Sequence, residues 1–266
     1  MIGIFDSGVG GLAIFRQVAN LLPQADITYL ADTDAFPYGP RSTQFLKSRT
    51  AALTRFLISQ GAGLVVVACN TATVVAISYL RQVFDIPFVG VEPPVKVAAE
   101  LPGREEPICV LLTQNTASGK KYADLVKKYS QGRRVEAVCL PLLARVVEDG
   151  GFRDQKAAAQ VVETVKNALG QLSAGAKVVL GCTHYIFLQE LLQEAFGPSV
   201  KILEPGRAVA EQVRRLLAEH GISAEENGRR EFYCTGDTDE FAARVENLLG
   251  KEKPVVKRVG AEELMI

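Results

Sequence analysis

Two of the five cysteines, Cys69 and Cys182, lie where a thiol could transfer protons. Each follows a run of apolar, largely β-branched residues that predicts a buried strand, and each precedes a predicted helix. At a helix start, the helix dipole and the free backbone amides favour the thiolate form of cysteine. Hydrogen-bonding residues rather than apolar ones follow both cysteines, namely Asn70, Thr71, Thr183 and His184. We therefore expect these two thiols to act as an acid and a base.

The other three cysteines have less distinctive surroundings. Cys109 and Cys139 lie inside predicted strands, where cysteine is commonly a small apolar core residue. The fifth cysteine, Cys234, could belong to a zinc site as an alternative to acid/base chemistry, since catalytic zinc can be held by two cysteines and one histidine. Its ligands would be Cys69, Cys182, His184 and Cys234. The short-range pair in that set, Cys182 and His184, has an unusual spacing, so we expect no metal site.

Two turn-rich segments could bind a ligand. The run Asp6-Ser7-Gly8-Val9-Gly10-Gly11 follows a predicted strand, and its small residues would let a ligand approach the amides of a helix start. The nucleotide fingerprint Gly-x-Gly-x-x-Gly is matched only weakly, because Ala13 stands at its last position, and a tight structural turn is the alternative. The run Asp32-Thr-Asp34-Ala-Phe-Pro37-Tyr38-Gly39 follows another strand and could present amides and a phenol, or be only a loop.

The elements that must position these residues follow an alternating pattern. Short β-branched runs alternate with amphipathic stretches, which predicts βαβ units and parallel sheets with function at the carboxyl ends of the strands. Strands are expected at residues 2–5, 27–31, 64–68, 88–91, 108–112, 135–140, 178–181, 200–203 and 232–234. Helices are expected, for example, at residues 44–59, 156–172 and 207–220.

The chain also contains an internal echo. Val65-Val-Val-Ala-Cys69-Asn-Thr resembles Val178-Val-Leu-Gly-Cys182-Thr-His, and the strand before Asp6 resembles the strand before Thr113. We expect an α/β fold of two similar doubly wound parallel-sheet lobes that face each other, with the active site between them. Residues 1–94 plus 207–266 would form the first lobe, which carries Cys69, and residues 95–206 the second, which carries Cys182. Prolines at 93, 94 and 205 mark the crossings, although any two βα units look somewhat alike.

Composition excludes several classes of function. Thirty basic and 30 acidic residues give a formal net charge of zero, so no long-range field attracts nucleic acid or anionic lipid. The apolar runs are too short to span a bilayer, and the N-terminus lacks a basic leader followed by an apolar stretch. An odd number of widely spaced cysteines favours reduced thiols. We expect a cytoplasmic protein with a small-molecule substrate and no nucleic-acid or membrane partner, and a homodimer is left open.

At these motifs the sequence resembles the glutamate racemases of bacterial cell-wall synthesis. The likeness covers nearly the whole chain, in Phe5-Asp-Ser-Gly-Val-Gly-Gly-Leu12, Pro37-Tyr-Gly39, Ala68-Cys-Asn-Thr-Ala72, Gly90-Val-Glu-Pro93, Leu180-Gly-Cys-Thr-His-Tyr185 and Thr235-Gly-Asp237. Ile186 departs from the proline usual in the family, and residues 112–116 depart somewhat from its usual run. The spacing that the family leads us to expect is kept by Thr113, Thr116, Ser118 and Tyr122.

The resemblance implies a cofactor-independent interconversion of L- and D-glutamate that supplies D-glutamate for peptidoglycan. Because the α-proton leaves one face and a proton returns to the other, two acid/base groups are needed. By resemblance, Cys69 deprotonates the D-enantiomer and Cys182 the L-enantiomer. Asp6 would assist Cys69, and Glu148 would orient His184, which assists Cys182; Asp32 is a further catalytic candidate. Substrate-binding residues would be Asp6, Ser7, Pro37, Tyr38, Gly39, Asn70, Thr71, Thr113, Thr116, Thr183 and His184.

Two other functions fit the same sequence. One is an aspartate racemase or another thiol-dependent racemase of the same superfamily, which rates on aspartate and glutamate would distinguish. The other is a two-lobed binding protein for acidic amino acids. Such a protein would need neither Cys69 nor Cys182, so their matched positions at strand ends favour an enzyme.

Overall fold

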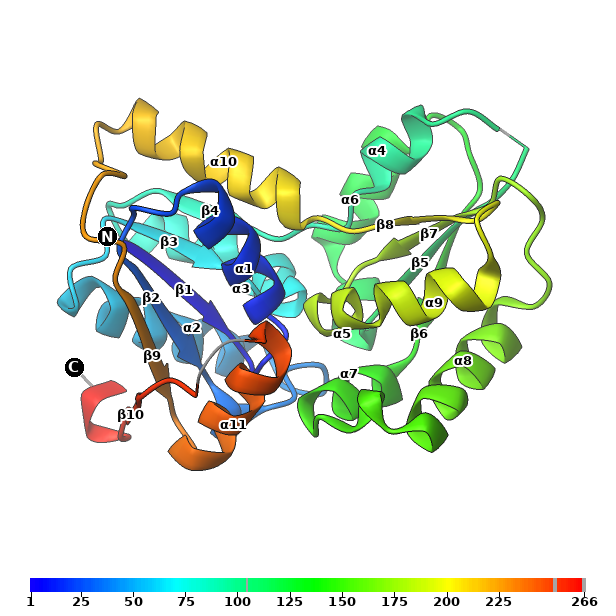
Figure 1. Ribbon diagram of the computed structural model, residues 1–266. Coiled ribbons are helices and arrows are strands. Elements are labelled where there is room, and N and C mark those ends of the chain that lie inside the picture. The colour runs from blue at the N-terminus through cyan, green and yellow to red at the C-terminus, as the bar shows by residue number, and fades with distance from the viewer. Residues whose placement is uncertain (104, 251–252, 265–266) are drawn as a thin grey trace.

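Two separate parallel sheets organise the computed structural model, which describes residues 1–103, 105–250 and 253–264 (Figure 1). The first sheet has the strand order β10-β9-β2-β1-β3-β4. Its strands are β1 (Ile2–Asp6), β2 (Ile27–Ala31), β3 (Leu64–Val67), β4 (Phe88–Gly90), β9 (Arg230–Cys234) and β10 (Val256–Arg258). The central strands β1, β2 and β3 are buried along their whole length, which is why they read as continuous apolar runs.

The second sheet has the strand order β6-β5-β7-β8 and is also parallel throughout. Its strands are β5 (Ile108–Leu112), β6 (Val135–Cys139), β7 (Lys177–Leu180) and β8 (Lys201–Leu203). The run β6-β5-β7-β8 repeats the order β2-β1-β3-β4 of the first sheet, with β5 in the place of β1 and β7 in the place of β3. The internal echo of the sequence thus corresponds to a repeated topology, and the predicted fold of two parallel-sheet α/β lobes is confirmed.

Helices cover both faces of the sheets and connect the strands (Figure 1). In the first lobe they are α1 (Leu12–Leu21), α2 (Thr43–Ser59), α3 (Asn70–Val83), α10 (Gly206–Glu219) and α11 (Thr238–Leu249), with short 3₁₀ turns η1 (Thr33–Ala35) and η4 (Glu262–Leu264). In the second lobe they are α4 (Val95–Glu100), α5 (Gln114–Ala117), α6 (Lys120–Tyr129), α7 (Pro141–Glu148), α8 (Gln155–Leu169) and α9 (Gln189–Phe196), with η2 (Gly151–Arg153) and η3 (Thr183–Leu188). None of the helices in the described ranges is both long and apolar enough to cross a membrane.

The chain passes from the first sheet to the second after β4 and returns after β8. The strands of the first sheet come from residues 2–90 and 230–258, and those of the second from residues 108–203. Helix α10 then packs along α1, which brings the chain back to the first sheet from residue 206 onward. The limits of the lobes at residues 94 and 207 stay a prediction.

The structure differs from the expected elements at three places. The short edge strand β10 was not expected, because two of its three residues are exposed and charged and it has no apolar run. The helix expected at 156–172 ends at Leu169, where Gly170 leaves the helical conformation with φ +65°. After Cys182 the chain forms the 3₁₀ turn η3 before α9, so the helix-dipole argument made for that thiol does not hold.

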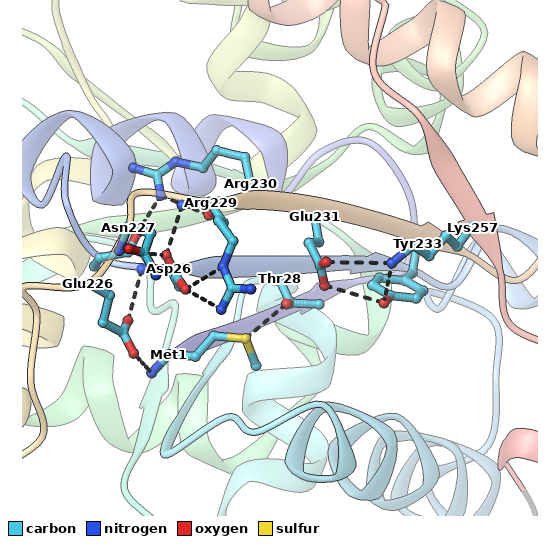
Figure 2. A network of polar contacts seen from close by, with 11 residues as sticks. Met1, Asp26, Thr28, Glu226, Asn227, Arg229, Arg230, Glu231, Tyr233 and Lys257 are labelled. Carbon is cyan, nitrogen blue, oxygen red and sulfur yellow. Dashed lines mark hydrogen bonds and ion pairs between the residues drawn. The ribbon is translucent and has the colours of Figure 1, made fainter.

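A buried carboxylate fixes the returning segment to the first sheet (Figure 2). Asp26, just before β2, accepts hydrogen bonds from the backbone amides of Asn227 at 3.1 Å and Arg229 at 2.8 Å, and from the Arg229 guanidinium at 2.8 Å. Glu226 accepts from the amino group of Met1 at 2.8 Å and from the Asp26 amide at 2.9 Å. These bonds set the register in which β9 pairs with β2.

We expect Asp26→Asn to lower the free energy of unfolding by about 1–3 kcal/mol at pH 7, since it weakens hydrogen bonds to a charged group. Burial opposes the charged form, but hydrogen bonds from Arg229 outweigh it and hold the pKa of Asp26 below its ordinary value. The stabilisation is therefore present above the unfolded-state pKa of about 3.9 and is lost as the pH falls through the lower folded-state value. Urea unfolding at several pH values measures this, with exposed Asp124→Asn as control; a loss that does not shrink in acid would contradict it.

Candidate active site

The two thiols lie at the carboxyl ends of corresponding strands. Cys69 follows β3 and is the N-cap residue of α3, while Cys182 follows β7 and precedes η3. Both are buried, and both line one cavity, together with Ser7 after β1 and Thr113 after β5. The cavity therefore lies between the carboxyl ends of the two sheets, where parallel α/β sheets bind ligands.

This cavity is small, with a volume of about 30 Å³, the share of a single water molecule in the liquid. Its lining is Ser7, Phe36, Pro37, Tyr38, Gly39, Cys69, Asn70, Thr71, Thr113, Ala144, Cys182, Thr183 and His184. A larger cavity of about 640 Å³ adjoins it, because the two share Phe36, Pro37, Gly39, Thr113 and Ala144. The cavity that holds the thiols thus lies next to a larger cavity, which is lined by residues of both lobes.

Most of the residues expected from the sequence line the inner cavity. The exceptions are Asp6, Asp32, Thr116 and Glu148, all of which are buried. Each of the four makes a hydrogen bond to a lining residue: Asp6 to Thr183, Asp32 to Tyr38, Thr116 to Thr71 and Thr113, and Glu148 to His184. These four therefore stand directly behind the cavity wall.

A chain of contacts supports Cys182. The Nδ1 atom of His184 lies 3.8 Å from Cys182 Sγ, and its Nε2 atom lies 2.8 Å from Glu148 Oε2. The Val9 amide also donates to Glu148 Oε2, at 2.9 Å. Burial disfavours the charged imidazole, but hydrogen bonds to Cys182 and Glu148 outweigh it and hold the pKa of His184 well above its ordinary value. The arrangement favours a protonated imidazole that would stabilise a thiolate beside it.

The glycine-rich turn of the first lobe is a contact surface for this chain of residues. A Cβ atom on Gly8 would lie 2.2 Å from Glu148 Oε2, and one on Gly10 would lie 2.3 Å from His184 Nδ1. Both distances are far below van der Waals contact, so no side chain fits at either position. The turn therefore lets side chains of the second lobe come close to the first lobe. Neither interpretation of the sequence, a ligand-binding turn or a tight structural turn, predicted this role.

The surroundings of Cys69 are different. Its Sγ atom lies 3.8 Å from Ser7 Oγ, and within the described ranges no imidazole forms a hydrogen bond with it. Asp6 is buried beneath this side, with Oδ1 accepting from the Gly8 amide at 2.9 Å and Oδ2 from Thr183 at 3.3 Å. Burial raises the pKa of Asp6, although the charge of His184 opposes the shift.

The expectation that the helix start would favour a Cys69 thiolate is wrong for the cavity as it stands. Burial raises the pKa of the Cys69 thiol far above its ordinary value, and the charge of Asp6 raises it further. The amide of Ala72 at the start of α3 acts in the opposite direction, but its effect is smaller. Desolvation therefore exceeds the helix-start effect, and Cys69 is a protonated thiol at neutral pH.

Asp32 acts on the cavity through Tyr38. Its Oδ2 atom accepts from the Tyr38 hydroxyl at 2.6 Å and from Arg49 Nε at 2.9 Å, and its Oδ1 atom accepts from Arg49 and, at 3.1 Å, from Thr235. This buried carboxylate is thus fully hydrogen-bonded. It fixes the Tyr38 ring in the cavity wall and does not itself line the cavity.

Three threonine hydroxyls join the two lobes at the cavity. Thr71 Oγ1 lies 2.9 Å from Thr113 Oγ1 and 3.4 Å from Thr116 Oγ1, and the last two lie 2.9 Å apart. Thr71 lies in the first turn of α3 in the first lobe, whereas Thr113 is the N-cap residue of α5 in the second. The result is a patch of neutral hydrogen-bond donors at the lobe boundary.

Comparison with known proteins agrees with this geometry. The family model described as Asp/Glu/Hydantoin racemase matches residues 10–213. The chain belongs to this racemase family. It is 40% identical to the glutamate racemase of Herpetosiphon aurantiacus, over 91% of this chain and 94% of that one. The glutamate racemase of Thermus thermophilus, solved with β-chloro-D-alanine, superposes with a TM-score of 0.82 at 31% identity, over 98% and 97% of the two chains.

A third relative bears on ligands of the family. The Escherichia coli glutamate racemase, solved with L-glutamate and the activator UDP-MurNAc-Ala, superposes with a TM-score of 0.84 at 28% identity, over 96% of each chain. The architecture of two parallel-sheet α/β lobes is therefore common to this chain and these racemases.

Sequence reasoning missed four residues of the site in this racemase fold. Phe36 and Ala144 line the cavity, and Arg49 and Arg244 hold Asp32 and Glu148. Phe36 could have been found from its place directly before the Pro-Tyr-Gly motif, but the arginines lie in ordinary amphipathic helices. Cys234, a ligand of the zinc alternative, is absent from the cavity lining, and its Sγ atom lies 3.6 Å from the Gly236 carbonyl oxygen.

We expect Gly10→Ala to lower kcat/KM for racemisation by about a hundredfold, because the new methyl group would displace the His184 ring by a fraction of an ångström or more. Circular dichroism of D-glutamate solutions over time measures the rate. Gly63→Ala is the matched control, since its methyl group would meet nothing closer than 3.6 Å. An unchanged kcat/KM in Gly10→Ala would contradict the tight approach of the lobes.

Proposed function

We propose that this chain interconverts L- and D-glutamate, with Cys69 and Cys182 as the two groups that exchange protons with the α-carbon. The observation that carries the proposal is the position of the two thiols: they end strands of separate sheets and line one buried cavity. A carbon bound between them would meet one sulfur on each face. The relatives named glutamate racemase support glutamate as the substrate.

In the L-to-D direction, Cys182 removes the α-proton and Cys69 supplies one to the opposite face. The contact with His184 supports the first role, because a charged imidazole stabilises the Cys182 thiolate. The raised pKa of the Cys69 thiol supports the second, since a protonated group is ready to donate. In the reverse direction Cys69 must become the thiolate, and the incoming substrate ammonium would favour that charge. Asp6, buried on the same side, would assist it.

Neutral groups would bind the substrate. The hydroxyls of Ser7, Thr71, Thr113 and Thr183 can donate to the two carboxylates without adding a fixed charge. Asn70 Nδ2 donates to the Val91 carbonyl at 3.1 Å, and its buried Oδ1 has no hydrogen-bond partner within the described ranges. This oxygen would accept a hydrogen bond from the substrate ammonium. Tyr38, held by Asp32, would close the wall beside it.

No cofactor is needed in this scheme, and the α-proton is abstracted in a cavity from which bulk water is excluded. Preorganised donors act strongly in such a site, because the effective dielectric constant is low. The substrate ammonium adjacent to the reacting carbon would offset part of the carbanion charge. Cofactor independence is thus an expectation, to be measured with enzyme dialysed against chelator in the presence of reductant.

The wider biological role follows from the same resemblance. D-glutamate made by this enzyme would supply peptidoglycan synthesis. The five cysteines are all free, which suits a reducing cytoplasm. The sequence leaves open both a homodimer and a response to an activator of the kind bound by the Escherichia coli relative. Aspartate remains the alternative substrate. A kcat/KM on aspartate equal to or higher than that on glutamate would contradict glutamate as the substrate.

We expect Cys69→Ser and Cys182→Ser each to lower kcat/KM by on the order of 10²–10⁴-fold, because a hydroxyl is a far weaker acid than a thiol. Circular dichroism with each enantiomer of glutamate, without added cofactor, measures the rates. Cys139→Ser and Cys109→Ser are the controls, since neither side chain lines the cavity. Near-parent turnover by Cys182→Ser would remove the second base, and glutamate binding without turnover in the parent would indicate a binding protein instead.

A further inference from the structure

Glu148 is held by groups from both lobes. Its Oε2 atom accepts from the Val9 amide and contacts His184 Nε2, and its Oε1 atom accepts from Arg244 Nη1 at 3.1 Å. The side chain is buried, so water does not replace these partners. His184 and Glu148 belong to the second lobe, whereas Val9 and Arg244 belong to the first. The support behind Cys182 is therefore completed across the lobe boundary.

Arg244 reaches this boundary from α11. In Figure 1, α11 lies beside α7, the helix that ends at Glu148. The Arg244 side chain is only 18% exposed, and its second partner is the exposed Glu240, one turn earlier on the same helix. An ordinary surface arginine would extend into water to lower its conformational entropy cost. The inward direction of Arg244 needs another reason.

We propose that Arg244 is a positioning residue for the Cys182 half of the reaction: it fixes Glu148, and Glu148 fixes the His184 imidazole beside the Cys182 sulfur. This inference rests on the proposed two-thiol function. Arg244 touches neither the cavity nor a sulfur, so it acts only through the other two side chains.

The physical basis is the cost of a buried carboxylate. The Val9 amide and the imidazole occupy Oε2, and Arg244 provides the donor to Oε1 and a positive charge opposite the carboxylate. Removing one partner of a buried ion pair leaves an uncompensated charge and destabilises the arrangement. Glu148 would then turn or take other partners, and His184 Nε2 would lose the acceptor that holds its proton. The Nδ1 atom would no longer be fixed toward Cys182.

The test replaces Arg244 by Gln, by Met and by Lys. Gln and Met remove the charge, and Met keeps the aliphatic stem, so that a packing loss is separated from a charge loss. Lys keeps the charge. Because Arg244 donates to Glu148 through Nη1 alone, the ammonium group of a lysine can make the same contact. The controls are Glu240→Gln, which removes the exposed partner of Arg244, and Arg215→Gln, which removes an exposed arginine paired with Glu219 on α10.

We expect Arg244→Gln and Arg244→Met to lower kcat/KM by about ten- to a hundredfold, as does loss of the groups that hold metal-binding histidines. The factor by which kcat/KM falls must be the same for L- and D-glutamate. The two enantiomers have equal free energy in water, so kcat/KM is equal in the two directions for every variant. Arg244→Lys, Glu240→Gln and Arg215→Gln should stay close to the parent rate. Thermal unfolding, measured on each variant, gives the fraction folded under assay conditions.

A second readout follows His184 itself and does not depend on turnover. The chain has two histidines, and His220, which is exposed at the end of α10, can be replaced by Gln to leave His184 as the single imidazole. In that background, NMR of ¹⁵N-labelled histidine should show a slowly exchanging Nε2 proton. We expect this proton to be retained in Arg244→Lys and to exchange rapidly in Arg244→Gln and Arg244→Met.

Two results would overturn the proposal. One is parent-like kcat/KM in folded Arg244→Gln or Arg244→Met. The other is a loss of rate while the Nε2 proton stays protected, which would indicate a merely structural role for Arg244. Failure of the two-thiol function is seen separately, as near-parent turnover in Cys182→Ser, and it would leave the NMR result on Arg244 and His184 standing.

Discussion

The proposed inversion at the α-carbon uses an acid and a base on opposite faces, and this geometric constraint would account for the two-lobed architecture. A single parallel sheet presents its functional residues along one edge, so it approaches a ligand from one side. Repeating the strand order β2-β1-β3-β4 as β6-β5-β7-β8 gives a second edge, and the strands β3 and β7 then deliver one thiol each to the same cavity. In the proposed mechanism, the remainder of the site would hold these two sulfurs and control their protons.

The control of protons depends on burial. Cys69 and Asp6 lie in a region without bulk water, which raises the pKa of both, whereas hydrogen bonds to Cys182 and Glu148 hold the pKa of His184 well above its ordinary value despite burial. The two sides of the cavity are therefore unequal before a substrate binds: one carries a protonated thiol and the other a thiol beside an imidazole. The glycine-rich turn makes this possible, because Gly8 and Gly10 let Glu148 and His184 approach the first lobe without a clash.

Much of this could be predicted from the sequence, because local patterns determine it. Buried strands such as β3 and β7 are continuous apolar runs, and the residues after them reach the carboxyl edge whatever else the chain does. What sequence reasoning could not supply depends on contacts between distant segments. Desolvation of Cys69 reversed the expected effect of the helix start, and Asp32 proved to lie behind Tyr38. Arg244 meets Glu148 only because the fold brings the α11 side chain to the end of α7. The exposed strand β10 gave no apolar signal at all.

The central claim is that two groups serve the two faces of the α-carbon, and the fate of the α-hydrogen tests it most directly. Racemisation of D-glutamate is started in deuterium oxide and stopped while little has turned over, and both enantiomers are separated and examined by NMR or mass spectrometry. With Cys182 exchanging with solvent on one side and Cys69 on the other, the donated hydrogen comes from solvent. The L-glutamate formed should carry deuterium at the α-carbon, while the remaining D-glutamate stays largely protiated. Early L-glutamate that retains the original α-hydrogen would show one base serving both faces and would contradict the account.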